Sequence, residues 1–160
     1  MLKKIIILIA LLFSSLSYSQ NSNSKTGNIV YLDVGLIFTG TFGALGTGIN
    51  YERILGENAS IKVGINISVF GAGSGGDAVG GSGIGIPVTL NLMTNGINKF
   101  ETNIGGGLNF PQGSKKARFF PALGLGYRHQ PEDNGLFYKA GVNFPANLYL
   151  SLGGLGYKFK

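Results

Sequence analysis

Residues 61–69 read Ile-Lys-Val-Gly-Ile-Asn-Ile-Ser-Val, with an apolar residue at every odd position and a polar residue or glycine at every even one. A period of two places the apolar side chains on one face of a β-strand, whereas a helix would scatter them around its circumference. The same alternation recurs along the chain. It predicts eight strands, over residues 30–39, 45–54, 61–70, 84–93, 100–110, 119–128, 136–144 and 148–159.

The last of these strands changes face part of the way along. The leucines from Leu148 to Leu152 share a face with Gly154, whereas the apolar residues from Leu155 to Phe159 lie on the other face. A β-bulge inserts one residue and so switches the face on which the following side chains lie, and glycine in a strand often marks one. We therefore expect a bulge near Gly153-Gly154.

The segments between the predicted strands differ in length. Residues 55–60, 94–99 and 130–135 are compact and carry turn signals such as Asn95-Gly96, whereas 71–83 and 111–118 are longer. Short turns at one end, longer loops at the other and an even strand count are typical of outer-membrane barrels. The predicted fold class is all-β, an eight-stranded antiparallel up-and-down transmembrane β-barrel over residues 30–160.

The first residues have the form of an export signal. Residues 1–19 carry Lys3 and Lys4, then the apolar run Ile5–Phe13, then Ser17-Tyr18-Ser19 with small residues where a signal peptidase needs them. The apolar run is shorter than the roughly 20 residues of a membrane-spanning helix. We predict a signal peptide over 1–19 and a short polar tether over 20–29.

Aromatic residues on the apolar face gather near the two ends of the predicted strands. Aromatic rings with polar tips favour the headgroup level of a membrane. Those at the end with the compact turns form a predicted membrane girdle: Tyr51, Phe100, Tyr127, Tyr138, Tyr157 and Phe159. Those at the opposite end are Phe38, Phe110, Phe119, Phe144 and Tyr149.

Charged residues gather on the opposite, polar face, near the compact turns. This predicted lumen charge network contains Asp33, Glu52, Lys62, Glu101, Arg128, Lys139 and Lys158. Buried charges persist only when they are paired, so the network is interpreted mainly as a structural plug, with a proton or ion path as the alternative. Strand pairing is expected to place Glu52 opposite Lys62 and Glu101 opposite Arg128. Barrel closure is a way to bring Asp33 near Lys158.

No constellation of residues indicates catalysis or cofactor binding. Gly71–Gly76 fits the dinucleotide pattern G-x-G-x-x-G, but no helix is predicted after it, so a surface loop is expected. His129 is the only histidine, and its predicted strand contains no serine nucleophile. One histidine and no cysteine leave no set of metal ligands. The prediction is a non-enzyme without cofactor or metal.

The net charge of +6 does not indicate a nucleic-acid partner. A nucleic-acid surface needs clustered cations, whereas here the cations are scattered along the strands. Only Lys115, Lys116 and Arg118 lie close together.

The chain resembles the small outer-membrane β-barrel proteins of Bacteroidota over most of its length. The segments that carry the resemblance are Asn50–Arg53, Ile86–Asn91, Phe100–Gly105, Gly124–Arg128 and Phe137–Gly141, with the closing residues Gly156–Lys160 similar to the terminal assembly signal of such proteins. The resemblance implies an outer-membrane location, contact with outer-membrane lipid and insertion by the barrel-assembly machinery.

Two classes of function remain after these exclusions. The first is a structural or surface-interaction protein with a plugged lumen, whose best candidate contact with a surface ligand is the loop 71–83. The alternative is a narrow channel or a transporter of a small solute or lipid. A soluble lipocalin-like lipid binder is a weaker alternative, as is a ligand cavity in the outer half of the lumen.

Overall fold

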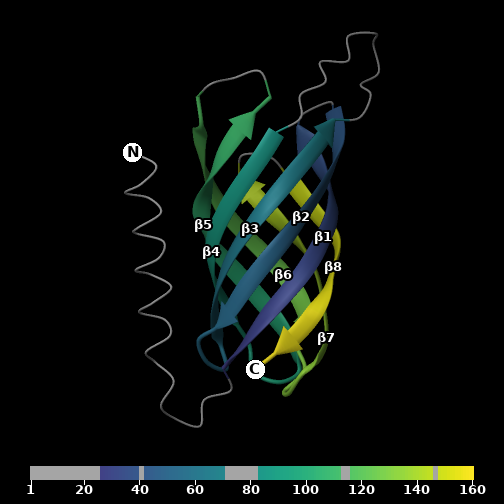
Figure 1. Ribbon diagram of the computed structural model, residues 1–160. Coiled ribbons are helices and arrows are strands. Elements are labelled where there is room, and N and C mark those ends of the chain that lie inside the picture. Colours follow the sequence, from purple (N-terminus) through teal and green to yellow (C-terminus); the bar gives the residue numbers. More distant parts are fainter. Residues whose placement is uncertain (1–25, 40–41, 71–82, 113–115, 146–147) are drawn as a thin grey trace.

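Eight strands form one closed antiparallel β-barrel in a computed structural model that describes residues 26–39, 42–70, 83–112, 116–145 and 148–160 (Figure 1). Each strand pairs with its neighbours in sequence, and the last pairs with the first. The predicted eight-stranded antiparallel fold is confirmed. The strands are β1 (Gly27–Thr39), β2 (Phe42–Ile54), β3 (Ala59–Phe70), β4 (Gly83–Met93), β5 (Asn98–Pro111), β6 (Arg118–His129), β7 (Gly135–Pro145) and β8 (Leu148–Phe159).

The strands extend up to three residues beyond the predicted bounds at one end or the other. The largest correction concerns the predicted tether, because β1 already begins at Gly27. Ile29 is fully buried and lies opposite Lys158 of β8, so Gly27–Ile29 belong to the barrel. The predicted signal peptide, residues 20–25 of the tether and residues 71–82 of the long loop lie outside the described residues. Among the described residues, no helix is long and apolar enough to cross a membrane.

The two ends of the barrel differ, and we name them the turn end and the loop end. The turn end holds the connections 55–58, 94–97 and 130–134, together with the start of β1 and the end of β8 (Figure 1). At the loop end, β3 and β4 are joined by the longest connection, whereas β1 to β2 and β7 to β8 are joined by short ones. The predicted longer loops are therefore found at two of the four connections there.

Most apolar side chains of the strands face outward and most polar ones face inward, except for a small inward cluster of Ile29, Tyr31, Ile54 and Phe137. The exposed pattern along β4 shows the alternation, with Ile84, Ile86, Val88, Leu90 and Leu92 all outward. Asn91 of the same strand is fully buried in the lumen. The period of two that predicted the strands therefore also separates a polar interior from an apolar exterior.

The predicted bulge in β8 is confirmed, one residue earlier than expected. Val34 pairs with Gly153, but the next residue, Gly35, pairs with Ser151, so Leu152 has no opposite residue on β1. Leu152 faces outward, and Ser151 before it faces the lumen. The extra residue therefore keeps both halves of β8 with their apolar side chains outside.

Glycines in the lumen make room for large side chains of the neighbouring strand. Gly156 lies directly opposite Tyr31 across the β1–β8 pair. A Cβ at Gly156 would collide with the Val30 carbonyl oxygen and the Tyr31 side chain, and the backbone oxygen cannot swing away. By contrast, a Cβ at Gly153 would meet nothing within 4 Å.

This contrast predicts the effect of two matched substitutions in β8. Gly156→Ala should lower the free energy of unfolding by about 1–3 kcal/mol, because overpacking forces backbone shifts. Gly153→Ala should leave it unchanged within error. Urea unfolding of the folded protein in detergent, followed by circular dichroism, measures both. Equal stability of the two variants would contradict the close packing of Gly156 against Tyr31.

Candidate functional site

The lumen near the turn end is filled by a cluster of buried charges, which we call the plug: Glu52, Glu101, Arg128 and Lys139. Arg128 Nη1 donates to Glu52 Oε1 at 2.7 Å and to Glu101 Oε2 at 2.9 Å, and the Lys139 ammonium donates to Glu101 Oε1. Two carboxylates face two cations, so the plug carries no net charge. Each charge has a partner of opposite sign, as burial requires.

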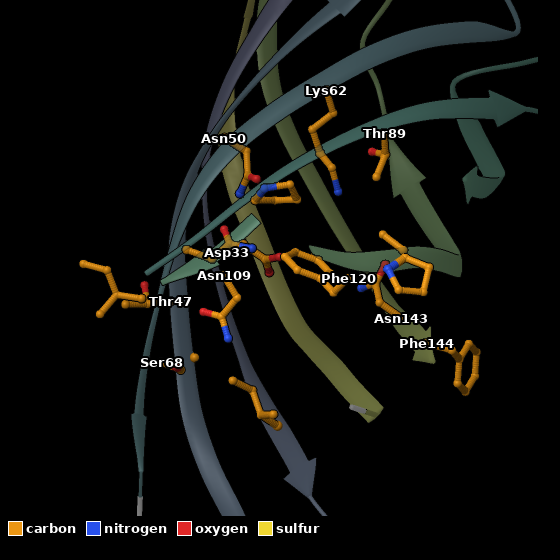
Figure 2. Close-up of a pocket in the computed structure, with 18 residues that line it drawn as sticks. Asp33, Thr47, Asn50, Lys62, Ser68, Thr89, Asn109, Phe120, Asn143 and Phe144 are labelled. Atoms are coloured by element: carbon orange, nitrogen blue, oxygen red, sulfur yellow. The ribbon is translucent and has the colours of Figure 1, made fainter. Parts of the chain in front are cut away.

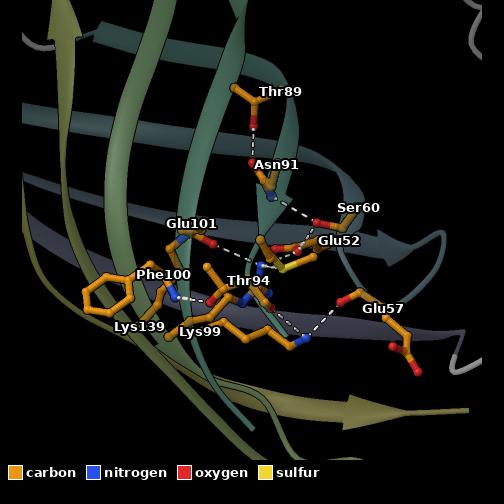
Figure 3. A network of polar contacts seen from close by, with 12 residues as sticks. Glu52, Glu57, Ser60, Thr89, Asn91, Thr94, Lys99, Phe100, Glu101 and Lys139 are labelled. Atoms are coloured by element: carbon orange, nitrogen blue, oxygen red, sulfur yellow. Dashed lines mark hydrogen bonds and ion pairs between the residues drawn. The ribbon is translucent and has the colours of Figure 1, made fainter. Parts of the chain in front are cut away.

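Hydrogen bonds extend the plug across the lumen to β3 and β4 (Figure 3). Ser60 donates to Glu52 and accepts from Asn91 Nδ2 at 3.2 Å. Asn91 Oδ1 in turn accepts from Thr89 Oγ1 at 3.1 Å. The connected side chains run from Lys139 of β7 to Thr89 of β4, so the plug joins strands on opposite sides of the barrel.

Two inward aromatic rings support the cations of the plug. The rings of Tyr31 and Phe137 lie 5.1 Å apart, centroid to centroid. The Arg128 guanidinium lies 4.7 Å from the centroid of Phe137, and the Lys139 ammonium 5.6 Å from that of Tyr31. Cation–π contacts of this kind gain strength where water is excluded. The apolar and charged parts of the plug therefore form one packed unit.

Two lysines close the lumen below the plug, at the turn end. The Lys99 ammonium donates to the carbonyl oxygens of Glu57 at 2.7 Å and Thr94 at 3.3 Å. The Lys158 ammonium donates to those of Pro131 at 2.7 Å and Glu132 at 2.6 Å. Between them the two side chains contact all three turns of this end, which fixes the turns over the mouth of the lumen.

The structure brings together four of the seven predicted lumen charges in the plug. Lys62 lies opposite Glu52 in the predicted register, but Glu52 pairs with Arg128 instead. Asp33 and Lys62 lie on the wall of a cavity beyond the plug. Lys158 lies at the mouth of the turn end.

Two of the three expected pairings rest on a wrong register. Arg128 lies opposite Lys99 and not opposite Glu101, because the β5–β6 pairing is shifted by two residues, yet the long Arg128 side chain still reaches Glu101. Lys158 lies opposite Ile29, four residues along β1 from Asp33, so the expected Asp33–Lys158 pair is wrong. Asp33 Oδ1 accepts a hydrogen bond from Ser151 Oγ at 2.6 Å.

Sequence reasoning missed three side chains that the lumen needs. Ser60 and Lys99 were assigned to turns, but both are buried in strands. Phe137 was not assigned to either face, although it lies two residues from Lys139 and therefore on the same face of β7. Each of the three lies two residues from a predicted inward charge, so the period-two alternation, continued along the strand, would have placed all three side chains inward.

A cavity of about 210 Å³ lies in the lumen on the loop-end side of the plug (Figure 2). Thr89, the last member of the hydrogen-bonded chain, lines it, so the cavity begins where the plug ends. Its other polar lining residues in the described ranges are Asp33, Thr47, Asn50, Lys62, Asn66, Ser68, Asn109 and Asn143. The part of the lumen that the sequence analysis kept as an alternative ligand site is thus a real hollow with polar walls.

The predicted girdle aromatics lie on the outer surface. Phe100, Tyr127, Tyr138, Tyr157 and Phe159 are exposed near the turn end, and Tyr51 is half-buried, with its hydroxyl donating to Asn28 Oδ1 at 2.6 Å. At the loop end Phe110, Phe119 and Phe144 are exposed, whereas the side chains of Phe38 and Tyr149 lie outside the described part of the chain.

The side chain of His129 has structural contacts. Its ring stacks on that of Tyr138 at 4.9 Å, and Nδ1 lies 2.9 Å from Asn98 Oδ1. Within the described ranges, no three His, Cys, Asp or Glu side chains gather as metal ligands would. No protein-family model matches this chain, and no curated protein matches it either.

The plug predicts a large effect of a nearly isosteric substitution. Glu101→Gln should lower the free energy of unfolding by about 3–5 kcal/mol, because Arg128 and Lys139 would lose a buried carboxylate partner. Adding Lys139→Met should recover part of the loss by removing one uncompensated cation. Urea unfolding in detergent measures both variants.

The matched control is the exposed ion pair between Asp133 and Lys160, whose nitrogen and oxygen lie 2.6 Å apart. The hydrogen bond from Lys160 lowers the pKa of the Asp133 carboxyl below its usual value. Exposed pairs contribute little to stability, so Asp133→Asn should cause no measurable loss near neutral pH. Losses of equal size for Glu101→Gln and Asp133→Asn would contradict the role assigned to the plug.

Proposed function

We propose that this protein is an integral outer-membrane β-barrel with a plugged lumen and a structural or surface-interaction role. The observation that carries the proposal is the exterior. Apolar side chains cover the outward face of all eight strands, with aromatic residues near both ends.

The physical argument rests on the cost of leaving that exterior in water. Outward residues such as Leu32, Ile49, Leu125 and Leu155 are more than half exposed, and they belong to a band that continues around the barrel. Each Å² of apolar surface kept in water costs about 25 cal/mol, and soluble monomers rarely expose apolar patches above a few hundred Å². A lipid bilayer removes this cost, and a closed barrel leaves no strand edge unpaired within it.

The interior supports the same proposal over a soluble lipid carrier. A lipocalin-like barrel needs an apolar lumen for its ligand and a polar exterior for water. Here Glu52, Glu101 and Arg128 are buried inside and the leucines lie outside. The export signal expected over 1–19 and the resemblance to Bacteroidota barrels agree with insertion into the outer membrane by the barrel-assembly machinery.

The plug favours a structural or surface role over transport. It fills the lumen between the cavity and the turn end with paired side chains, and Lys99 and Lys158 tie the turns over the mouth. A surface ligand would then bind through the outer connections, of which residues 71–83 were the sequence-based candidate. The alternative, a narrow channel or transporter, needs a lumen that opens through the plug.

Membrane integration is tested by fractionation and by gel mobility. We expect the protein in the outer-membrane fraction, resistant to extraction by carbonate, with different mobility of boiled and unboiled samples because a closed barrel resists detergent. Gly156→Ala, which should loosen the barrel, should lose the unboiled form at a lower temperature than wild type. Recovery in the soluble periplasmic fraction, with one mobility throughout, would contradict the membrane proposal.

The closed lumen is tested in planar bilayers. Wild-type protein should show no steady single-channel openings, because ionic side chains fill the narrow part of the lumen. Glu101→Gln should show more current noise than wild type if it folds, since the plug loses its central carboxylate. Steady openings in the wild type would instead favour the channel alternative.

A further inference from the structure

The cavity beyond the plug is lined by side chains whose hydrogen-bonding capacity the barrel itself does not use. Asn50, Lys62, Asn66, Asn109 and Asn143 line it, and none of these side chains has a hydrogen bond or ion pair with another residue in the described ranges. Asn50 is 2% exposed. Buried polar groups are normally paired, so five unused polar side chains around one hollow indicate a site for a polar ligand.

One amide in the filled part of the lumen serves as a comparison. Asn91 accepts from Thr89 and donates to Ser60, so both ends of its amide are occupied. The amides around the cavity come from the same kind of inward strand position but lack such partners. The wall is open at Gly85, where a Cβ would have nothing nearer than 4.0 Å.

Among the lining residues that the structure describes, one side chain carries each sign of charge. Lys62 reaches toward the hollow from β3, and Asp33 lies on β1 with its Oδ1 held by Ser151 (Figure 2). A carboxylate can accept about four hydrogen bonds, so a carboxylate that already has partners can still accept from a ligand's ammonium group. Lining side chains of both signs suit a ligand that carries both signs better than a multiply charged anion such as phosphate.

The size of the cavity limits the ligand to a small molecule. At about 30 Å³ of liquid volume per water, a volume of about 210 Å³ equals roughly seven waters. That is below the roughly 300–1,000 Å³ of sites for drug-sized ligands. Phe120 and Pro121 add an apolar wall against which a short carbon chain can pack.

We infer that this cavity binds a small zwitterion of the amino-acid type, with its carboxylate on Lys62, its ammonium on Asp33 and the asparagine amides around its polar groups. The inference goes beyond the proposed envelope role and rests on the lumen alone. It stands whether or not the barrel spans a membrane.

The test uses the full purified protein, folded in detergent, and four probes in isothermal titration calorimetry up to about 10 mM. L-Serine carries both charges, ethanolamine lacks the carboxylate, 3-hydroxypropionate lacks the ammonium, and glucose is uncharged. We expect serine to bind at least about tenfold more tightly than any other probe, because each of the others loses one or both charge-assisted hydrogen bonds.

Two variants assign the charges. Lys62→Met should weaken serine binding about tenfold and leave ethanolamine unaffected, whereas Asp33→Asn should weaken serine and leave 3-hydroxypropionate unaffected. Lys160→Met, at the opposite end of the barrel, is the control and should bind serine as wild type does. Circular dichroism and the unboiled gel form check that each variant is folded.

Three results would overturn the inference. They are no heat with serine, equal binding of serine and glucose, and undiminished serine binding by folded Lys62→Met. If either variant fails to fold, the wild-type protein still tests the inference through its affinities for serine, ethanolamine and 3-hydroxypropionate. Equal affinity for all three would rule out recognition of both charges.

Discussion

The contact of Arg128 with Glu52 determines what the rest of the lumen can be. Their strands, β6 and β2, lie four places apart in a ring of eight, so the 2.7 Å ion pair spans the barrel from one wall to the other. A buried guanidinium without carboxylates would cost several kcal/mol. The acidic residues on β2 and β5 must therefore lie at the level of Arg128. The unfilled part of the lumen then lies between this level and the loop end.

Glycine placement divides the lumen into a filled and a hollow half. Gly126 lies beside the Glu101 side chain, and Gly154 lies beneath those of Lys139 and Tyr31, so the missing Cβ atoms make room for the long side chains of the plug. Beyond Thr89 the lumen holds the cavity, and a Cβ at Gly85 on its wall would have nothing nearer than 4.0 Å. The same residue types thus produce a solid core at one end and a polar hollow at the other.

Sequence alone could predict the strands, their faces and the level of the charges, because a period of two is a local property that each strand repeats. It could not predict partners across the lumen. A two-residue register shift between β5 and β6 depends on the geometry of the intervening loop, and the reach of the Arg128 side chain then compensates for it. The sequence analysis assigned Ser60 and Lys99 to turns because they lie at strand ends, where neighbouring turn residues obscure the alternation of the strand. The cavity depends on the sizes of side chains from seven strands, so no single stretch of sequence indicates it.

The pairing of β1 with β8 has a consequence for assembly of the barrel. It joins the most distant parts of the chain, and the Ser151–Asp33 hydrogen bond crosses 118 positions of sequence. All other strand pairs are hairpins that can form locally, whereas this seam bears the full entropy of closing the loop. Lys158 and Lys160 tie the end of β8 to the turn before β7, so contacts local to the final hairpin also hold the strand that closes the ring. The seam is therefore the one strand pair of the barrel that no local hairpin can form.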